Sequence, residues 1–204
     1  DVYKRQDFDV VLKFGLPAIF AAILGALALG WFAVSDTALT IVVNEQVFAQ
    51  ITPVKLVIGL MMIAFALFEL LPRFRALQFE RRYLSLGGVL SGFFGGLSGH
   101  QGALRSAFLA KTGLDTQQYV GTNAMLGFLV DLTRISVYVA LFSAAGGSAG
   151  DFAGWPLVIT GSVAAFSGVM IGKRYLQKVT MKSVQTLVGV LLFGVGLALV
   201  IGIL

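Results

Sequence analysis

Six long apolar runs leave this chain few ways to fold outside a lipid bilayer. A membrane-spanning helix needs about 20 mostly apolar residues, and 57% of the chain is hydrophobic while only 12% is charged. The runs are rich in Leu, Ala and Gly and apolar on every side, whereas strands of a membrane barrel alternate with a period of two. The sequence therefore predicts an all-α, polytopic membrane protein. The runs cover residues 16–34, 56–71, 83–99, 119–142, 155–172 and 184–204.

Basic residues predict how these runs are oriented. Cytoplasmic loops of membrane proteins carry an excess of Lys and Arg, so the two basic loops are predicted to be cytoplasmic. The loops 35–52 and 143–150 carry only Asp36 and Glu45, and are predicted to face outward. The net charge of +5 is thus explained by orientation in the bilayer and predicts no nucleic-acid partner. The basic residues are Arg73, Arg75, Arg81 and Arg82 after the second run, and Lys173, Arg174, Lys178 and Lys182 before the last.

These orientations require the segment 83–117 to leave the cytoplasmic side and return to it. The stretch 102–113 is too short to cross alone, because as a helix it spans about 18 Å against a hydrocarbon core of about 30 Å. The sequence therefore predicts a broken or re-entrant, Gly-rich helix pair. Within it Gly88 and Gly92 recur at a four-residue spacing that lets helices approach closely, so they are predicted to form a packing seam.

A weak internal repeat runs through the chain. The segment from Leu56 resembles the segment from Thr186, with Gly59 aligned on Gly189, and Pro17 falls on Pro156. The loop charges give the two copies opposite orientations, as in the inverted repeats of many secondary transporters. The predicted divisions are an N-terminal segment without assigned function at 1–13, the end of a first repeat at 14–72 with two transmembrane helices, and a second repeat at 83–204 with the broken pair and three transmembrane helices.

The first copy lacks a counterpart of 83–142. The sequence therefore predicts that the chain is a fragment, or a degenerate form, of a larger transporter.

The break itself is the best candidate for a substrate site. Gly95, Gly96, Gly99 and Gly102 each lower helix propensity by about 1 kcal/mol relative to Ala, so this stretch is predicted to unwind. Freed amides and the N-terminus of the following helix would then present N–H donors and a positive dipole end to an anion. The full set of predicted substrate-binding residues is Gly95, Gly96, Ser98, Gly99, His100, Gln101, Gly102, Arg105, Ser106, Thr122 and Asn123.

Arg105 is the strongest single candidate because its planar guanidinium suits a carboxylate, sulfite or sulfonate. The alternative is that Arg105 neutralises Asp131 or reaches toward the membrane surface. Asp131 and Arg134 lie three apart on one helix face and form either a coupling site or a structural ion pair. His100 is the sole histidine, which excludes a multi-histidine metal site and leaves a structural role or a proton relay. No metal, cofactor or catalytic residue is predicted.

The stretches GGVLSGFFGGLSGHQGALRSAFL at 87–109 and GTNAMLGFLVDLTRISVY at 121–138 resemble the TauE/SafE family of sulfite exporters and organosulfonate permeases. The family glycine pattern is matched by Gly88, Gly92, Gly95, Gly96 and Gly99. Departures from the family occur after the break, at 100–102 and at 105–106.

The resemblance implies secondary transport of a small sulfur-containing or carboxylic anion across the bacterial cytoplasmic membrane. It also implies the lipid bilayer, the anion and a coupling ion as partners. One alternative is a homodimer, in which a second copy of the chain completes the site in trans. Substrate, direction and coupling ion remain open.

Two rival interpretations remain. The chain could be a non-transporting membrane partner or half-transporter, since one copy of the Gly-rich unit is missing. A remote alternative is an intramembrane serine protease, because residues 96–99 read G-L-S-G. Against it, His100 lies only two residues from Ser98 and no other histidine exists to act as the general base.

Overall fold

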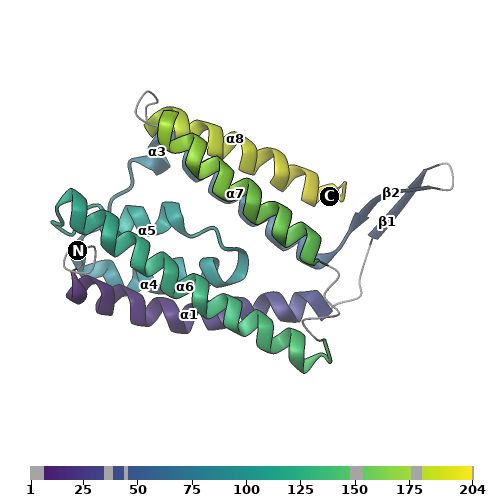
Figure 1. The fold of residues 1–204 in the computed structure, drawn as a ribbon, viewed down its shortest axis with the longest axis horizontal. Helices are drawn as coiled ribbons and strands as arrows, with labels where there is room; N and C mark the ends of the chain where they lie inside the picture. The colour runs from purple at the N-terminus through teal and green to yellow at the C-terminus, as the bar shows by residue number, and fades with distance from the viewer. Residues whose placement is uncertain (1–6, 35–38, 44–45, 148–153, 176–180, 204) are drawn as a thin grey trace.

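The computed structural model describes residues 7–34, 39–43, 46–147, 154–175 and 181–203 (Figure 1). Five of its helices are long and apolar enough to cross a membrane, which confirms the predicted all-α, polytopic class. Lys178 in the last basic loop, and Asp36 and Glu45 in the first predicted outward loop, lie outside the described residues. The elements are α1 (Phe8–Val34), β1 (Leu39–Val43), β2 (Gln46–Ile51), α2 (Pro53–Leu70), α3 (Pro72–Arg75), a 3₁₀ turn at Arg81–Tyr83, α4 (Leu84–Ser98), α5 (Gly102–Leu109), α6 (Thr116–Ala144), α7 (Trp155–Tyr175) and α8 (Met181–Val200).

Two features differ from the sequence-based expectation. The predicted outward loop contains an antiparallel hairpin of β1 and β2, in which Leu39 pairs with Ile51; the strand 39–43 is rich in β-branched residues, which favour this conformation. Helix α1 begins at Phe8, well before the predicted run. Val10 is fully buried, so the part of the N-terminal segment that the structure describes contributes to the core.

Helices α1 and α4 pack backbone against backbone. A Cβ atom placed on Gly88, Gly92 or Gly96 would collide with a carbonyl oxygen of α1, those of Phe14, Ala18 and Ala22 in turn. Lipid tails are as apolar as leucine, so close van der Waals packing of small residues, rather than the hydrophobic effect, holds such helices together. The predicted packing seam is confirmed, and Gly96 belongs to it.

The broken pair α4 and α5 enters and leaves at the same end of the molecule (Figure 1). The N–H of Phe79, just before the pair, donates to the carbonyl of Ala107 in α5 at 3.1 Å. Arg81 likewise donates to the carbonyl of Thr112, just after the pair, at 3.4 Å. The predicted re-entrant arrangement is therefore confirmed. Phe14, Leu84, Phe108 and Leu126 form part of the buried cluster that joins this pair to α1 and α6.

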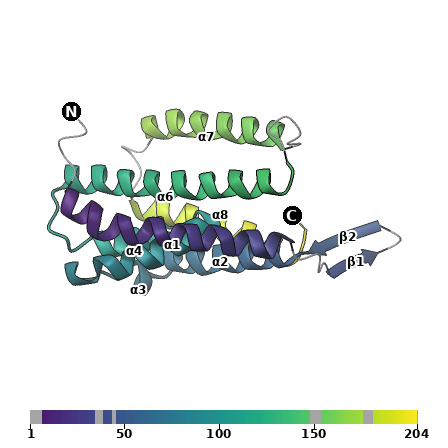
Figure 2. The same ribbon diagram turned by 90° about the horizontal axis from the view of Figure 1, so that it is seen from below.

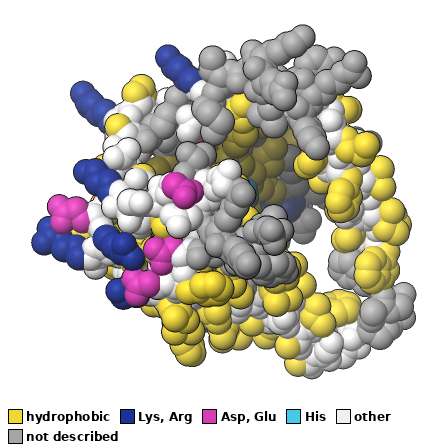
Figure 3. All heavy atoms as spheres, turned by 60° about the vertical axis from the view of Figure 1, so that its left-hand side comes forward, with side chains coloured by type: hydrophobic (Ala, Val, Ile, Leu, Met, Phe, Trp, Pro, Cys, Tyr) yellow, Lys and Arg dark blue, Asp and Glu magenta, His cyan; other side chains and the backbone are white. Residues whose placement is uncertain are grey.

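Charged side chains gather at the end where α1 and α4 begin (Figure 3). Arg81 contacts Asp9 at 2.9 Å, and Lys13 contacts the same carboxylate at 2.9 Å. The α3 helix and the start of α8 lie at this same end (Figure 1). Both predicted cytoplasmic loops thus approach one side of the bundle, as the orientation prediction requires.

Helices α2 and α8 form a separate antiparallel pair with reciprocal contacts. A Cβ on Gly59 would meet Val200 at 2.8 Å, and a Cβ on Gly189 would meet Leu70 at 2.8 Å. Gly59 and Leu70 occupy in α2 the positions that Gly189 and Val200 occupy in α8 when the two segments are aligned. Such reciprocity is typical of a two-fold axis, and it supports the inverted repeat, which remains a prediction.

Helix α7 lies to one side of the other helices (Figure 2). None of its apolar window Trp155–Gly172 is buried, whereas half of the window in α1 is. A Cβ atom placed on Gly161 or Gly168 would have no neighbour within 4 Å, so this helix exposes small residues as well as large apolar ones.

Candidate functional site

The helix break spans residues 99–101. Helix α4 ends in a left-handed cap at Gly99, with φ of 78°, whose N–H donates to the carbonyl of Gly95 at 2.9 Å. The N–H of Gln101 then bonds back to the carbonyl of Gly99 at 3.2 Å, and α5 starts at Gly102. A left-handed conformation costs any residue other than Gly about 1–2 kcal/mol. The break predicted from the glycine density is confirmed.

Arg105 lies one turn into α5 and is almost wholly buried, with 9% of its surface exposed. Its Nε donates to Oδ1 of Asn123 in α6 at 2.6 Å. Its Nη1 is buried and has no hydrogen-bond partner among the described residues. Gly127 makes room for this guanidinium, because a Cβ there would lie 3.0 Å from Nη1. Arg105 and Asn123, two predicted site residues, therefore meet.

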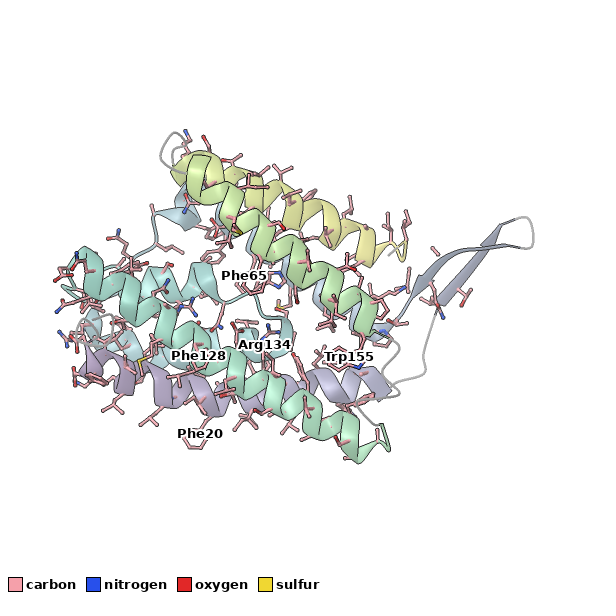
Figure 4. All side chains as sticks on the ribbon, viewed as in Figure 1. Phe20, Phe65, Phe128, Arg134 and Trp155 are labelled. Atoms are coloured by element: carbon pink, nitrogen blue, oxygen red, sulfur yellow. The ribbon has the colours of Figure 1, made fainter. Side chains whose placement is uncertain are left out.

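The alternative pairing of Arg105 with Asp131 does not form. Asp131 Oδ1 instead accepts from Nε of Arg134 at 2.9 Å, which is the i,i+3 ion pair that the spacing allowed. Arg134 also reaches the break, since a Cβ on Gly99 would lie 3.0 Å from its Nη1. Figure 4 shows Arg134 on the inner side of α6, while Phe20 points outward from α1. Two arginines from two helices thus flank the unwound segment.

His100 and Gln101 point to opposite sides of the chain. The Gln101 side chain lies against Gly95 and Val130, between α4 and α6, and its buried Oε1 has no partner in the described structure. The His100 ring stacks on Phe65 of α2 with ring centres 6.3 Å apart. Its Nδ1 is likewise buried and unpartnered among the described atoms. The break therefore presents one polar side chain to α6 and another to α2.

Four predicted residues lie apart from the contact between Arg105 and Asn123. The hydroxyl of Thr122 is fully buried and accepts from the N–H of Asp7 at 3.2 Å, so Thr122 holds the start of α1 rather than facing the break. Ser98 donates back to the carbonyl of Phe94 at 3.2 Å. Ser106 lines a cavity whose lining does not include Asn123. Gly96 belongs to the seam with α1, as described above.

Two cavities adjoin the break on the side of α2 and α8. The first, of about 210 Å³, is lined by the break, by Phe65 and Glu69 of α2, and by Val188 and Leu192 of α8. The second, of about 250 Å³, shares Glu69, Gly102 and Ala103 with the first and extends to Ser106 and to Tyr119 of α6.

Two residues of this region escaped the sequence reasoning. Glu69 is an acidic residue inside an apolar run, which is a signal in its own right because ionisable groups are costly in lipid. Tyr138 of α6 donates its hydroxyl proton to the carbonyl of Gly96, at the end of α4. No spacing in the sequence distinguishes Tyr138 from other aromatic residues of the run.

The geometry gives no support to the protease alternative. The Ser98 hydroxyl is engaged with a carbonyl of its own helix, and the His100 ring faces Phe65. A nucleophile must instead be hydrogen-bonded to its base.

Long apolar helices around a re-entrant, glycine-broken pair are typical of a multi-pass membrane protein. A family model described as sulfite exporter TauE/SafE matches residues 2–199. The chain therefore belongs to the TauE/SafE sulfite exporter family, as the glycine motif indicated. This is a family of transporters rather than enzymes, and membership implies membrane transport. No curated protein and no solved structure matches the sequence.

Proposed function

We propose that this protein carries a small sulfur-containing anion, such as sulfite or an organosulfonate, across the bacterial cytoplasmic membrane as a secondary transporter. The anion binds between the helix break and α6, on the guanidinium of Arg105. The observation that carries this proposal is the buried Nη1 of Arg105, which has no partner among the described residues. A buried guanidinium nitrogen without a hydrogen-bond partner is unfavourable, so a bound anion that accepts from it would stabilise this site.

The surroundings of Arg105 suit an oxyanion. Asn123 fixes Nε at 2.6 Å, which leaves the two terminal nitrogens to donate parallel hydrogen bonds. Sulfite and sulfonate groups offer two or three oxygens in the right geometry for such a fork. Gly127 keeps the space beside these nitrogens free of a side chain. The first amides of α5 and the positive end of its dipole add further donors.

Arg134 adds a second positive charge near Gly99, but its pairing with Asp131 offsets most of that charge. Asp131 and Arg134 are therefore assigned to holding α6 against the break, and Arg105 to binding the anion.

Movement of the anion requires two units that can shift past each other. One unit consists of α1, α4, α5 and α6, joined through their buried cluster. The other consists of α2 and α8, which pack on each other through glycines. The break lies between these units, and rocking of α2 and α8 would open it to either side of the membrane, as in transporters built from inverted repeats.

The test is counterflow of labelled sulfite, and of labelled ethanesulfonate, in proteoliposomes. Arg105→Gln removes the charge and most donors, and a hydrogen bond to a charged group is worth about 1.5–3 kcal/mol. We therefore expect an affinity about 10- to 100-fold lower, with the protein still folded. Arg82→Gln, at a side chain 69% exposed, is the matched control and should transport like wild type. Unchanged affinity in a folded Arg105→Gln protein would refute the site.

One observation favours the alternative of a half-transporter. None of the apolar window 155–172 of α7 is buried, and this window carries small residues at Gly161 and Gly168, which in membranes commonly mark helix contacts. A second copy or another membrane partner would then complete the assembly. Light scattering of the detergent-purified protein distinguishes these cases, since a monomer active in counterflow rules out the half-transporter.

A further inference from the structure

Gln101 has a buried side chain whose hydrogen-bonding capacity is not fully used. Only 4% of its surface is exposed. Its backbone carbonyl accepts from the N–H of Arg105 at 3.0 Å and from the hydroxyl of Ser91 in α4 at 3.5 Å. Its side-chain Oε1, in contrast, has no hydrogen-bond partner among the described residues. Because native structures rarely leave a buried acceptor unpaired unless water or a ligand satisfies it, Gln101 needs a donor from outside the described chain.

Gln101 and Arg105 present an acceptor and a donor to the same stretch of α6. Gln101 is the N-cap of α5 and Arg105 follows four residues later, so their side chains lie on one face of this helix. The guanidinium of Arg105 lies against Gly127, and the amide of Gln101 lies beside Val130. Gly127 and Val130 are three residues apart and share one face of α6. Two unpaired polar atoms of opposite kind, Oε1 of Gln101 and Nη1 of Arg105, therefore lie on one side of the break.

An acceptor beside a donor selects a ligand that carries the opposite pair. The free N–H of Arg105 suits an oxyanion, whereas Oε1 of Gln101 can only accept. A plain sulfonate offers acceptors alone, so it would satisfy Arg105 and leave Gln101 without a donor. A sulfonate that also carries a hydroxyl group would satisfy both. Gln101 and Arg105 are about 6 Å apart along the helix axis, and a hydroxyl placed two carbons from the sulfur spans a similar length.

The charges nearby favour a hydroxyl over an ammonium group as this donor. Arg105 is a buried cation on the same side of the break, and Arg134 reaches the break at Gly99. The carboxylate of Asp131 already accepts from Arg134 at 2.9 Å. Because like charges repel strongly where little water screens them, an ammonium group would be unfavourable here. A neutral hydroxyl avoids that repulsion.

We propose that Gln101 is a specificity-determining residue of the anion site and selects a sulfonate that carries a hydroxyl group two carbons from the sulfur. This inference rests on the proposed anion transport and names the substrate within that class. Arg105 binds the sulfonate oxygens, and Oε1 of Gln101 accepts from the hydroxyl of the same anion. A site built to bond a substrate hydroxyl rejects the analogue that lacks it, because the buried polar atom of the site is then left unpaired.

The experiment compares two sulfonates of nearly equal size. Unlabelled 2-hydroxyethanesulfonate competes with labelled ethanesulfonate in counterflow, and so does propane-1-sulfonate, in which a methyl group replaces the hydroxyl. Because the methyl compound leaves a buried acceptor unpaired, we expect the wild-type protein to bind the hydroxy compound about 10- to 100-fold more tightly. Equal affinities would overturn the proposal, as when a buried water satisfies Gln101. Stronger competition by 2-aminoethanesulfonate than by the hydroxy compound would overturn the choice of a hydroxyl.

Gln101→Met tests whether Gln101 makes this choice. Methionine is similar in size and flexible, and its thioether is only a weak acceptor. The variant should therefore lose the preference through a lower affinity for the hydroxy compound alone. Gln78→Met, at an exposed glutamine before the broken pair, is the matched control and should keep the preference. The proposal is wrong if Gln101→Met keeps the preference, or if it weakens both compounds equally because the amide donates to the sulfonate.

Failure of this inference can be told apart from failure of the proposed transport. Sulfonates that are carried without a preference for the hydroxyl refute only the role of Gln101, whereas the absence of any sulfonate transport refutes the substrate class. In that second case, thermal unfolding of the purified protein with 3-hydroxypropanoate and with butanoate, its methyl counterpart, still tests the need for a donor. Wild type should be stabilised more by the hydroxy acid, and Gln101→Met equally by both. Equal stabilisation of wild type, or none, would overturn the selection by Gln101 whatever the anion.

Discussion

The two sides of the helix break differ in what they offer a ligand. Toward α6 the break meets guanidinium groups, since Arg105 and Arg134 both lie within reach of backbone at Gly127 and Gly99. Toward α2 and α8 it meets Glu69, aromatic rings and open cavities. The same three unwound residues thus separate a packed, positively charged side from a hollow side with a carboxylate. The difference teaches that a short helix break can present opposite charge and different packing to the helices on its two sides.

Glycine accounts for much of this asymmetry. Gly95 of α4 and Gly127 of α6 each lie against a polar side chain that an added methyl group would displace. This side chain is Gln101 at Gly95 and Arg105 at Gly127. At Gly102, where α5 starts, an added Cβ would have no neighbour within 4 Å. Bare backbone is therefore required where the polar side chains are packed, and is tolerated where they are not.

The largest expected effect comes from placing a carboxylate on the α6 side of the break, which would remove the difference in charge between the two sides. Asn123→Asp is nearly isosteric and puts a negative charge about where Oδ1 now accepts from Nε of Arg105 at 2.6 Å. The new ion pair would compete with the transported anion. Because a hydrogen bond to a charged group is worth about 1.5–3 kcal/mol, we expect the affinity for ethanesulfonate to fall at least about 10-fold. Counterflow at a series of ethanesulfonate concentrations measures this.

The matched control for this variant is Gln117→Glu, which adds the same charge in the exposed first turn of the same helix. A carboxylate there is favourable to the helix dipole, so transport should stay at the wild-type level. Equal loss in both variants would mean that negative charge on α6 acts at long range, and the special role of Arg105 would be lost.

A second comparison uses Gly99, in the break, and Gly102, at the start of α5. Gly99→Ala forces a left-handed residue and places a methyl group 3.0 Å from Nη1 of Arg134. We expect it to destabilise the protein by about 1–2 kcal/mol. Gly102→Ala meets nothing within 4 Å and lies at a helix start, so it should leave stability unchanged or raise it by up to about 1 kcal/mol. Thermal unfolding in detergent measures both, and equal unfolding temperatures would contradict the conformational requirement at Gly99.

The fold was predictable because lipid imposes strong rules on sequence. Run length, glycine spacing and loop charge predicted the spanning helices, the seam of Gly88 and Gly92, and the re-entrant pair. The hairpin 39–51 was missed because it lies in a segment that the membrane does not constrain. The first turns of α1 were missed because Asp9 and Lys13 interrupt the apolar run, although Val10 beside them is buried.

The site was predictable only in part. Motif position brought Arg105, Gln101 and Asn123 into the set, but helix geometry turned Thr122 toward Asp7, one position away from Asn123. Neighbours on a helix are rotated by about 100°, so one sequence motif cannot tell which of two adjacent polar residues faces the site. Glu69 could have been found, since it is an acidic residue within a predicted span. Its proximity to His100 depends on how α2 packs, which no local pattern encodes.

The smallest expected effect concerns Tyr138, which links α6 to the end of α4 just before the break. Its hydroxyl donates to the carbonyl of Gly96, one of the last carbonyls of α4, which have no partner in the helix itself. Tyr138→Phe keeps the ring and removes this bond, and hydrogen bonds between membrane helices are worth about 0.6 kcal/mol on average. We expect a slightly lower unfolding temperature with ethanesulfonate affinity unchanged. Tyr83→Phe, at the exposed start of α4, should unfold like wild type. If Tyr138→Phe instead weakened anion binding with stability intact, the Tyr138 hydroxyl would belong to the anion site together with Arg105. The anion site would then extend along α6 beyond Arg134.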